Sequence, residues 1–147
     1  SADVSTYQPV VDSWEPYELS LPVRGRGAVV KVLVRAGGHE RGPFPAYLDT
    51  GASVTVLDHG VIHALGAEPV AAAGLHVLGR GEVSHHGVYP VEVALADVPS
   101  DARRWVALEA LDGTVNPKGT AAALGRDFLA HLVLTYDGPA NRVLLRW

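Results

Sequence analysis

Hydrophobic residues along this chain occur in short runs that alternate with polar or small residues and are separated by turn-forming residues. Residues 28–36 are rich in valine, and Phe44, Ala46 and Leu48 alternate with smaller or polar neighbours, so both stretches are predicted to be strands. A glycine-rich turn over 37–43 is expected to join them as a hairpin. We expect further strands over 54–57, 89–96, 105–110, 132–136 and 142–147, the last two joined by a turn over 137–141.

Two short helices interrupt this pattern. Asp58 is placed to cap a helix that runs to about Leu65 and ends at Gly66 and Pro69, and residues 126–131 form the second. Residues 111–120 are predicted to be a loop, because they contain Asp-Gly and Asn-Pro turn signals. Many short strands at regular spacing with few helices predict an all-β domain, closed and barrel-like.

The chain divides into a polar N-terminal arm or linker, residues 1–27, interrupted by prolines, and a domain over residues 28–147. Its 147 residues are 48% apolar and 19% charged, which is typical of one globular domain. The net charge of −4 and the lack of a basic cluster argue against nucleic-acid binding. No apolar run approaches the roughly 20 residues that a membrane-spanning helix needs.

The chain contains neither cysteine nor methionine. Disulfides, thiolate metal sites and cysteine nucleophiles are therefore excluded. Because Ser1 cannot be a translational start as written, we expect a processed product or an excised domain, which leaves the cellular compartment open. The abundance of alanine, valine, glycine and arginine is typical of a bacterial protein with GC-rich coding.

Asp49 is the most informative residue for function, because it follows an apolar strand and begins the small-residue turn Asp49-Thr50-Gly51-Ala52. A carboxylate at the end of such a strand is expected at the rim of the core. There burial disfavours its charge, whereas donors from Thr50, Gly51 and Ala52 favour it. A carboxylate in this setting suits general acid–base catalysis. The alternative is a structural Asp49 that forms an Asx-turn or caps a helix.

A second segment, Ala123-Leu124-Gly125-Arg126-Asp127, sets an apolar run before a glycine and the start of a helix. In combination with Asp49-Thr50-Gly51-Ala52, it resembles the retropepsin-like aspartic proteases, over residues 29–145. The resemblance implies that this segment passes behind the catalytic turn, where Gly125 avoids a clash, and that its helix packs on the domain. The segment Leu78-Gly79-Arg80-Gly81-Glu82, with the strand after it, is similar to the flap hairpin of that family.

The resemblance further implies a symmetric homodimer, because the chemistry of this family uses two facing carboxylates and this chain has one Asp-Thr-Gly. Asp49 from each subunit would form the dyad, Thr50 would hydrogen-bond across the two-fold axis, and a water activated by the dyad would attack a peptide bond. The implied partners are a second copy and a polypeptide substrate, with no cofactor, metal or nucleic acid. The C-terminal hairpin is longer than the short viral tail, so the cellular and bacterial members are the better comparison.

Substrate contacts are expected from the flap residues Leu78, Gly79, Arg80, Gly81 and Glu82 and from Ala52, Ser53 and Val54 beside the dyad. For Ser53 and Val54, plain strand packing is the alternative.

Viral members often carry an aspartate at the position of Ser53 that pairs with the late arginine. Arg126 must therefore find another partner, and Asp127, Asp58 or a backbone carbonyl are candidates.

Two other functions stay open. The same fold could serve as a non-catalytic or occluded peptide-binding or dimerisation module, or as an enzyme that becomes active only after partner binding or self-cleavage of residues 1–27.

The histidines offer a weaker hypothesis. His59 and His63 are four residues apart on the predicted helix, a spacing that can hold a metal, but no carboxylate or cysteine completes a recognisable set. His85 and His86 lie in the flap strand, where neighbours point to opposite faces. Either could make the behaviour of the flap sensitive to pH, since histidine changes charge near neutrality.

Overall fold

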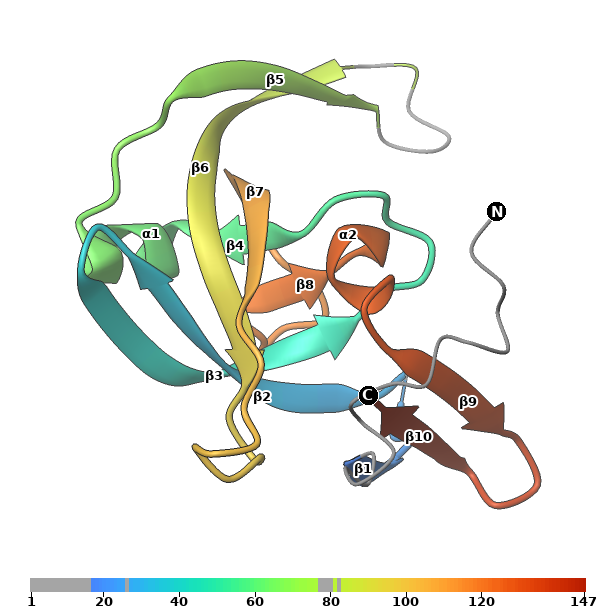
Figure 1. The fold of residues 1–147 in the computed structure, drawn as a ribbon. Helices are drawn as coiled ribbons and strands as arrows, with labels where there is room; N and C mark the ends of the chain where they lie inside the picture. Colours follow the sequence, from blue (N-terminus) through green and yellow to red (C-terminus); the bar gives the residue numbers. More distant parts are fainter. Residues whose placement is uncertain (1–16, 26, 77–80, 82) are drawn as a thin grey trace, which may run out of the picture.

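The computed structural model describes residues 17–25, 27–76, 81 and 83–147. Within these residues the chain forms ten strands and two short helices, shown in Figure 1. In chain order they are β1 (Glu18–Pro22), β2 (Val29–Ala36), β3 (His39–Leu48), β4 (Val56–Asp58), α1 (His59–Leu65), β5 (Ala71–His76), β6 (Val83–Leu95), β7 (Val106–Gly113), β8 (Ala122–Leu124), α2 (Arg126–Leu129), β9 (Val133–Asp137) and β10 (Arg142–Arg146).

Six strands form a closed barrel in the order β2-β3-β8-β4-β7-β6, and pairing between β2 and β6 closes it. This confirms the predicted all-β, barrel-like fold with two short helices. Strand β5 lies outside the ring and pairs with the first half of β6. In Figure 1 this hairpin arches over one end of the barrel, above β4, β8 and α2.

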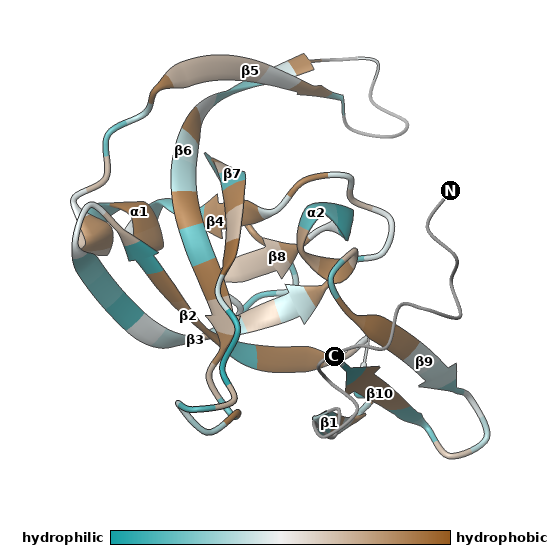
Figure 2. Cartoon of the chain, in the orientation of Figure 1, coloured by the Kyte–Doolittle hydropathy of each residue, from teal (hydrophilic) through white to brown (hydrophobic). Residues whose placement is uncertain are grey.

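The core follows from the alternation of side chains along the strands. Val30, Val32 and Val34 of β2 are buried, whereas Val29 before them and Lys31 between them are exposed. Figure 2 shows hydrophobic stretches in several strands, β2 and β9 among them, whereas the first part of β3 is hydrophilic. The barrel interior therefore holds the hydrophobic cluster and positions the loops at its end.

Two segments predicted as turn or loop are partly strand. The turn expected over 37–43 is limited to Gly37 and Gly38, and residues 39–43 belong to β3. Gly42 has a φ of 125° beside a register shift between Val32 and Val34, so the Gly-Pro pair marks a β-bulge inside a strand. Likewise β7 runs to Gly113, past the start of the predicted loop at 111.

The helix over 59–65 is confirmed at both ends. The Asp58 side chain accepts from the backbone N–H of Gly60, and Gly66 ends the helix in the left-handed conformation with a φ of 61°. The second predicted helix is shorter than expected, since α2 ends at Leu129. No helix of the described residues is long and apolar enough to cross a membrane.

A second sheet, β1-β10-β9, lies beside the barrel. It includes part of the predicted N-terminal arm, because β1 pairs antiparallel with β10 along its whole length. The ring of Tyr17, just before β1, stacks on that of Trp147, with centroids 5.2 Å apart. Residues 1–16 of the arm lie outside the described residues.

Candidate active site at the end of β3

Asp49 lies immediately after β3, where the strand leaves the barrel, and is half-buried. Its backbone N–H donates to the Leu124 carbonyl of β8 at 2.9 Å, so the residue is held by the same parallel pairing that joins β3 to β8. The backbone N–H of Gly51 donates to the Asp49 carboxylate at 3.1 Å, and the Ala52 N–H donates to the Asp49 carbonyl at 3.2 Å. Both contacts fold residues 49–52 into a tight turn that presents the carboxylate at the barrel rim.

Gly51 and Gly125 both permit close approaches in this region. A Cβ on Gly51 would lie 3.3 Å from the Asp49 carboxylate oxygen. A Cβ on Gly125 would lie 2.5 Å from the backbone carbonyl carbon and oxygen of Val54, a distance that no side-chain movement can relieve. The segment around Gly125 thus passes directly behind residues 49–55, as the resemblance implied.

Asp127 joins this segment to the loop in front of it. Its carboxylate accepts from the Thr55 hydroxyl at 2.7 Å, from the Thr55 N–H at 3.0 Å and from the Phe128 N–H at 2.8 Å. The Thr55 hydroxyl in turn accepts from the Gly125 N–H at 3.1 Å. Thr55 is fully buried, so these bonds lie in a low-dielectric setting where each counts for more than at the surface.

Arg126 takes a backbone carbonyl as its partner, one of the three candidates considered above. Its Nη1 donates to the Thr50 carbonyl at 2.8 Å, and its backbone N–H donates to the Ala52 carbonyl at 2.8 Å. Asp58 is engaged at the start of α1. The first turn of α2 therefore holds two successive parts of the Asp49 turn.

The other predicted site residues are placed as follows. Thr50 and Ser53 are exposed at the turn, and Ala52 and Val54 are partly buried. Gly81 is exposed, with a φ of 63°. Leu78, Gly79, Arg80 and Glu82 lie outside the described residues.

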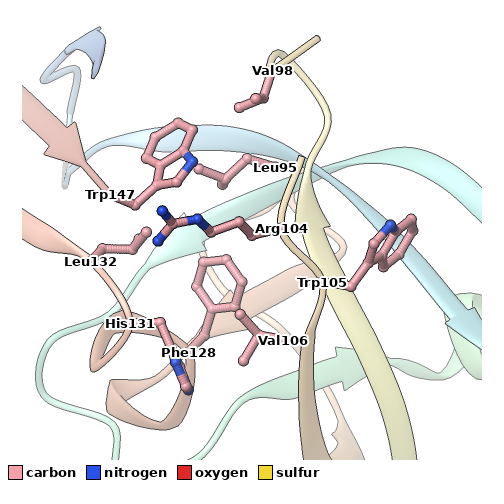
Figure 3. A pocket seen from close by; sticks show the side chains of 9 residues that line it. All are labelled: Leu95, Val98, Arg104, Trp105, Val106, Phe128, His131, Leu132 and Trp147. Carbon is pink, nitrogen blue, oxygen red and sulfur yellow. The ribbon is translucent and has the colours of Figure 1, made fainter. Parts of the chain in front are cut away.

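One hollow in the described part of the chain is lined by residues other than Asp49 and its turn. It is a cavity of about 150 Å³ between the β6–β7 turn, α2 and the C-terminal residue. Figure 3 shows the Arg104 side chain between Trp147 and Phe128, beside the mostly apolar walls. None of the predicted site residues lines this cavity.

Sequence reasoning missed Thr55. The available signal was a threonine inside the apolar run Val54-Thr55-Val56-Leu57, where a hydroxyl must find a partner once buried. For the weaker hypothesis of a metal site at His59 and His63, no group of three or more His, Asp or Glu side chains in the described part of the chain could hold an ion.

The fold is that of the retropepsin-like aspartic proteases. Neither a protein-family model nor a curated protein matches this chain. Among solved structures, a retropepsin-like aspartic protease from Rickettsia conorii matches with a TM-score of 0.60 and 13% identity, over 90% of this chain and 93% of that one. The protease of EIAV, complexed with the inhibitor HBY-793, matches with a TM-score of 0.49 and 22% identity, over 70% of this chain and 85% of that one. The retroviral protease-like domain of Ddi1 from Leishmania major matches with a TM-score of 0.41 and 13% identity, over 78% and 86%.

Proposed function

We propose that this chain is an aspartic endopeptidase that acts as a homodimer, with Asp49 of each subunit as a catalytic carboxylate. The observation that carries the proposal is the setting of Asp49. It is a carboxylate at the rim of a retropepsin-like barrel, in a glycine turn braced by the Gly125-Arg126-Asp127 segment.

In the proposed reaction the two Asp49 carboxyl groups face each other and share one proton, because like charges about 3 Å apart cannot both ionise. The ionised member takes a proton from a bound water, whose oxygen attacks the carbonyl carbon of the scissile peptide bond. The protonated member donates to the carbonyl oxygen. A proton then passes to the leaving nitrogen, the C–N bond breaks, and a carboxylic acid and an amine result.

The need for a second copy rests on the count of suitable turns. The chain has a single Asp-Thr-Gly. Two other Asp-Gly pairs have carboxylates with structural partners. Asp112 accepts from Gly87 and Tyr89 in the barrel wall, and Asp137 accepts from the Ala140 N–H in a turn. A dyad therefore requires Asp49 of another subunit.

The sheet β1-β10-β9 supports binding of a second subunit on the side of the barrel where Asp49 lies. Among the described residues β9 is an edge strand, and it carries the exposed apolar side chains Val133 and Tyr136. In Figure 1 the loop after β3, the end of β5 together with the start of β6, and β9 all project toward one side of the barrel. An unpaired edge with exposed apolar residues favours association with another chain. We assign this edge to the dimer interface.

A substrate in this site would be an extended polypeptide that pairs with main chain as an added strand. The proposed substrate contacts are Ala52, Ser53 and Val54, at and just after the Asp49 turn, and residues 78–82, which the sequence predicts as a flap.

The test is peptide-library cleavage at about pH 4 to 7 by the purified chain and by Asp49→Asn, with mass measured by light scattering in the same samples. Asparagine preserves the size of the side chain but cannot ionise. We expect a dimer whose cleavage falls at least roughly a hundredfold in the variant. Cleavage that survives the substitution would refute the assignment of Asp49. A dimer that cleaves nothing at any pH would instead favour a binding or dimerisation module with this fold.

A further inference from the structure

The β5–β6 hairpin leaves the barrel at a defined point. Val88 pairs with Ala71 of β5 and also with Leu111 of β7, and beyond it toward Val83 strand β6 pairs with β5 alone among the described strands. We call β5 together with residues 83–88 the flap hairpin. At its root the ladder between β6 and β7 ends, so any further hold of the barrel on the flap hairpin must come from side chains.

Asp112, the residue after Leu111, supplies such a hold. Its carboxylate accepts from the Gly87 N–H at 3.0 Å and from the Tyr89 hydroxyl at 3.2 Å. Burial, followed by the hydrogen bond to Asp112, raises the pKa of Tyr89, so this hydroxyl keeps its proton and remains a donor. Two imidazoles also approach the carboxylate: Nδ1 of His86 lies at 3.7 Å and Nδ1 of His59 at 3.8 Å.

His86 extends the contact from β7 to both strands of the flap hairpin. Its Nδ1 is hydrogen-bonded to the backbone carbonyl of Asp112, and its Nε2 lies 2.6 Å from the hydroxyl oxygen of Ser84. That hydroxyl also lies 3.2 Å from the Leu75 carbonyl of β5. The four groups form a chain of contacts that runs from β7 through β6 to β5.

The number of hydrogen bonds that these four groups can form depends on the charge of the His86 imidazole. A carbonyl can only accept, so Nδ1 of His86 carries a proton whenever it is bonded to Asp112. When the ring is neutral, Nε2 must accept the single hydroxyl proton of Ser84, and the Leu75 carbonyl receives none. When the ring is protonated, Nε2 donates to Ser84, and Ser84 is free to donate to Leu75. Every contact is then satisfied, with the Asp112 carboxylate 3.7 Å from the positive ring.

We propose that Asp112 and His86 are positioning residues for the flap hairpin, and that protonation of His86 ties both strands of the hairpin to the barrel. Of the two histidines considered for a pH response, His86 is half-buried and faces the barrel, whereas His85 is exposed. The inference rests on the proposed function only in its consequence, which is that substrate would meet a more rigid flap hairpin at acidic pH.

The titratable groups around His86 come from three directions. Strand β7 contributes Asp112, and α1 contributes His59, which competes for the same carboxylate. Tyr89 lies on β6 itself, and Glu68, before β5, acts on it electrostatically. Opposite His86, β5 presents Ala73, and the titratable His76 of β5 is exposed and faces Val83.

The experiment is hydrogen–deuterium exchange of backbone amides at about pH 5 and about pH 8, corrected for intrinsic exchange rates. It requires no activity. In the wild-type chain we expect protection of residues 71–76 and 83–88 to be roughly three- to tenfold higher at the acidic pH, the effect of about one net hydrogen bond. Residues 106–110 of β7 serve as the internal reference, and their protection should not follow the same change.

Three variants assign the effect. His86→Gln keeps a polar side chain without a titrating group and should abolish the pH difference. Ser84→Ala leaves His86 against Asp112 but breaks the link to Leu75. In this variant, the protection of the flap hairpin at about pH 5 should therefore be as low as in the wild-type chain at about pH 8. The matched control is His85→Gln, on the adjacent, exposed position, which should retain the wild-type response.

Equal protection of the wild-type flap hairpin at both pH values would overturn the proposal, as would a response that survives His86→Gln. The two proposals fail separately. A chain that cleaves nothing but shows the His86-dependent response supports the positioning role and contradicts the protease. A chain that cleaves peptides but shows no response supports the protease and contradicts the positioning role.

Discussion

Thr55→Val should destabilise the fold out of proportion to its small change in shape. The valine fills nearly the same volume, but it removes the hydroxyl that donates to the Asp127 carboxylate at 2.7 Å and accepts from the Gly125 N–H at 3.1 Å. Thr55 is fully buried, so water cannot replace these partners. A hydrogen bond to a charged group contributes about 1.5–3 kcal/mol, and an orphaned buried N–H costs about 1–3 kcal/mol. Allowing for the apolar methyl group gained, we expect a loss of about 3 kcal/mol.

Thr55→Ser is the matched control, because it keeps the hydroxyl and removes only the methyl group. The loss of one buried methyl costs about 0.8 kcal/mol. The serine variant should therefore be more stable than the valine variant by about 2 kcal/mol, although valine resembles threonine more closely in shape. Hydrophobic packing alone would predict the opposite order.

The free energy of unfolding should be measured by urea denaturation, followed by circular dichroism, at one fixed protein concentration because a dimer is expected. A valine variant as stable as the serine variant would refute the reasoning. It would mean that Asp127 and the N–H of Gly125 find other partners, and that the brace behind the Asp49 turn does not depend on Thr55.

Three further predictions concern the segment behind the Asp49 turn, the barrel wall and the edge strand β9. Gly125→Ala should prevent folding or lower the melting temperature sharply, since its Cβ would lie 2.5 Å from backbone. Gly138→Ala, where the nearest atom is 3.5 Å away, should melt like the wild type. The pKa of Glu92 is lowered by its hydrogen bond from Arg35, which faces it across the β2–β6 pairing. In urea denaturation at neutral pH, the wild type should therefore be more stable than Glu92→Gln. This difference in the free energy of unfolding should disappear as the pH falls below 4.5, the ordinary pKa of the carboxyl group. Tyr136→Lys, on the β9 edge, should shift the light-scattering mass toward the monomer, and Val70→Lys, at a comparably exposed apolar position outside β9, should not.

The features that sequence predicted well are those encoded by neighbouring residues. The helix cap at Asp58 and the left-handed Gly66 are separated by one short helix, and both lie where the capping pattern placed them. The valines of β2 alternate as a half-buried strand requires. The small-residue turn after β3 and the segment around the glycine before α2 could be recognised because each is a contiguous stretch of sequence.

The errors arose where tertiary pairing overrides local preference. Gly42 and Pro43 read as a turn, but the barrel needs a long β3, and the glycine is used for a bulge beside β2. Asp112 and Gly113 read as a loop, but parallel pairing with β4 keeps them in β7. Thr55 and Asp127 are 72 residues apart, so no local pattern could pair them.

The placement of Arg126 has a consequence for a dyad built from two copies. A guanidinium on the Asp49 carboxylate would favour the ionised form and oppose the sharing of a proton with a second carboxylate. Here Arg126 instead donates to the neutral carbonyl of Thr50, and the N–H of Gly51 is the hydrogen-bond donor to the Asp49 carboxylate. The turn is thus held in position without a cation on the carboxylate among the described residues. Within the proposed dimer, the interaction between the two Asp49 carboxyl groups then determines which of them carries the proton. The rigidity of each Asp49 turn comes from its own subunit, whereas the protonation of the dyad is a property of the pair.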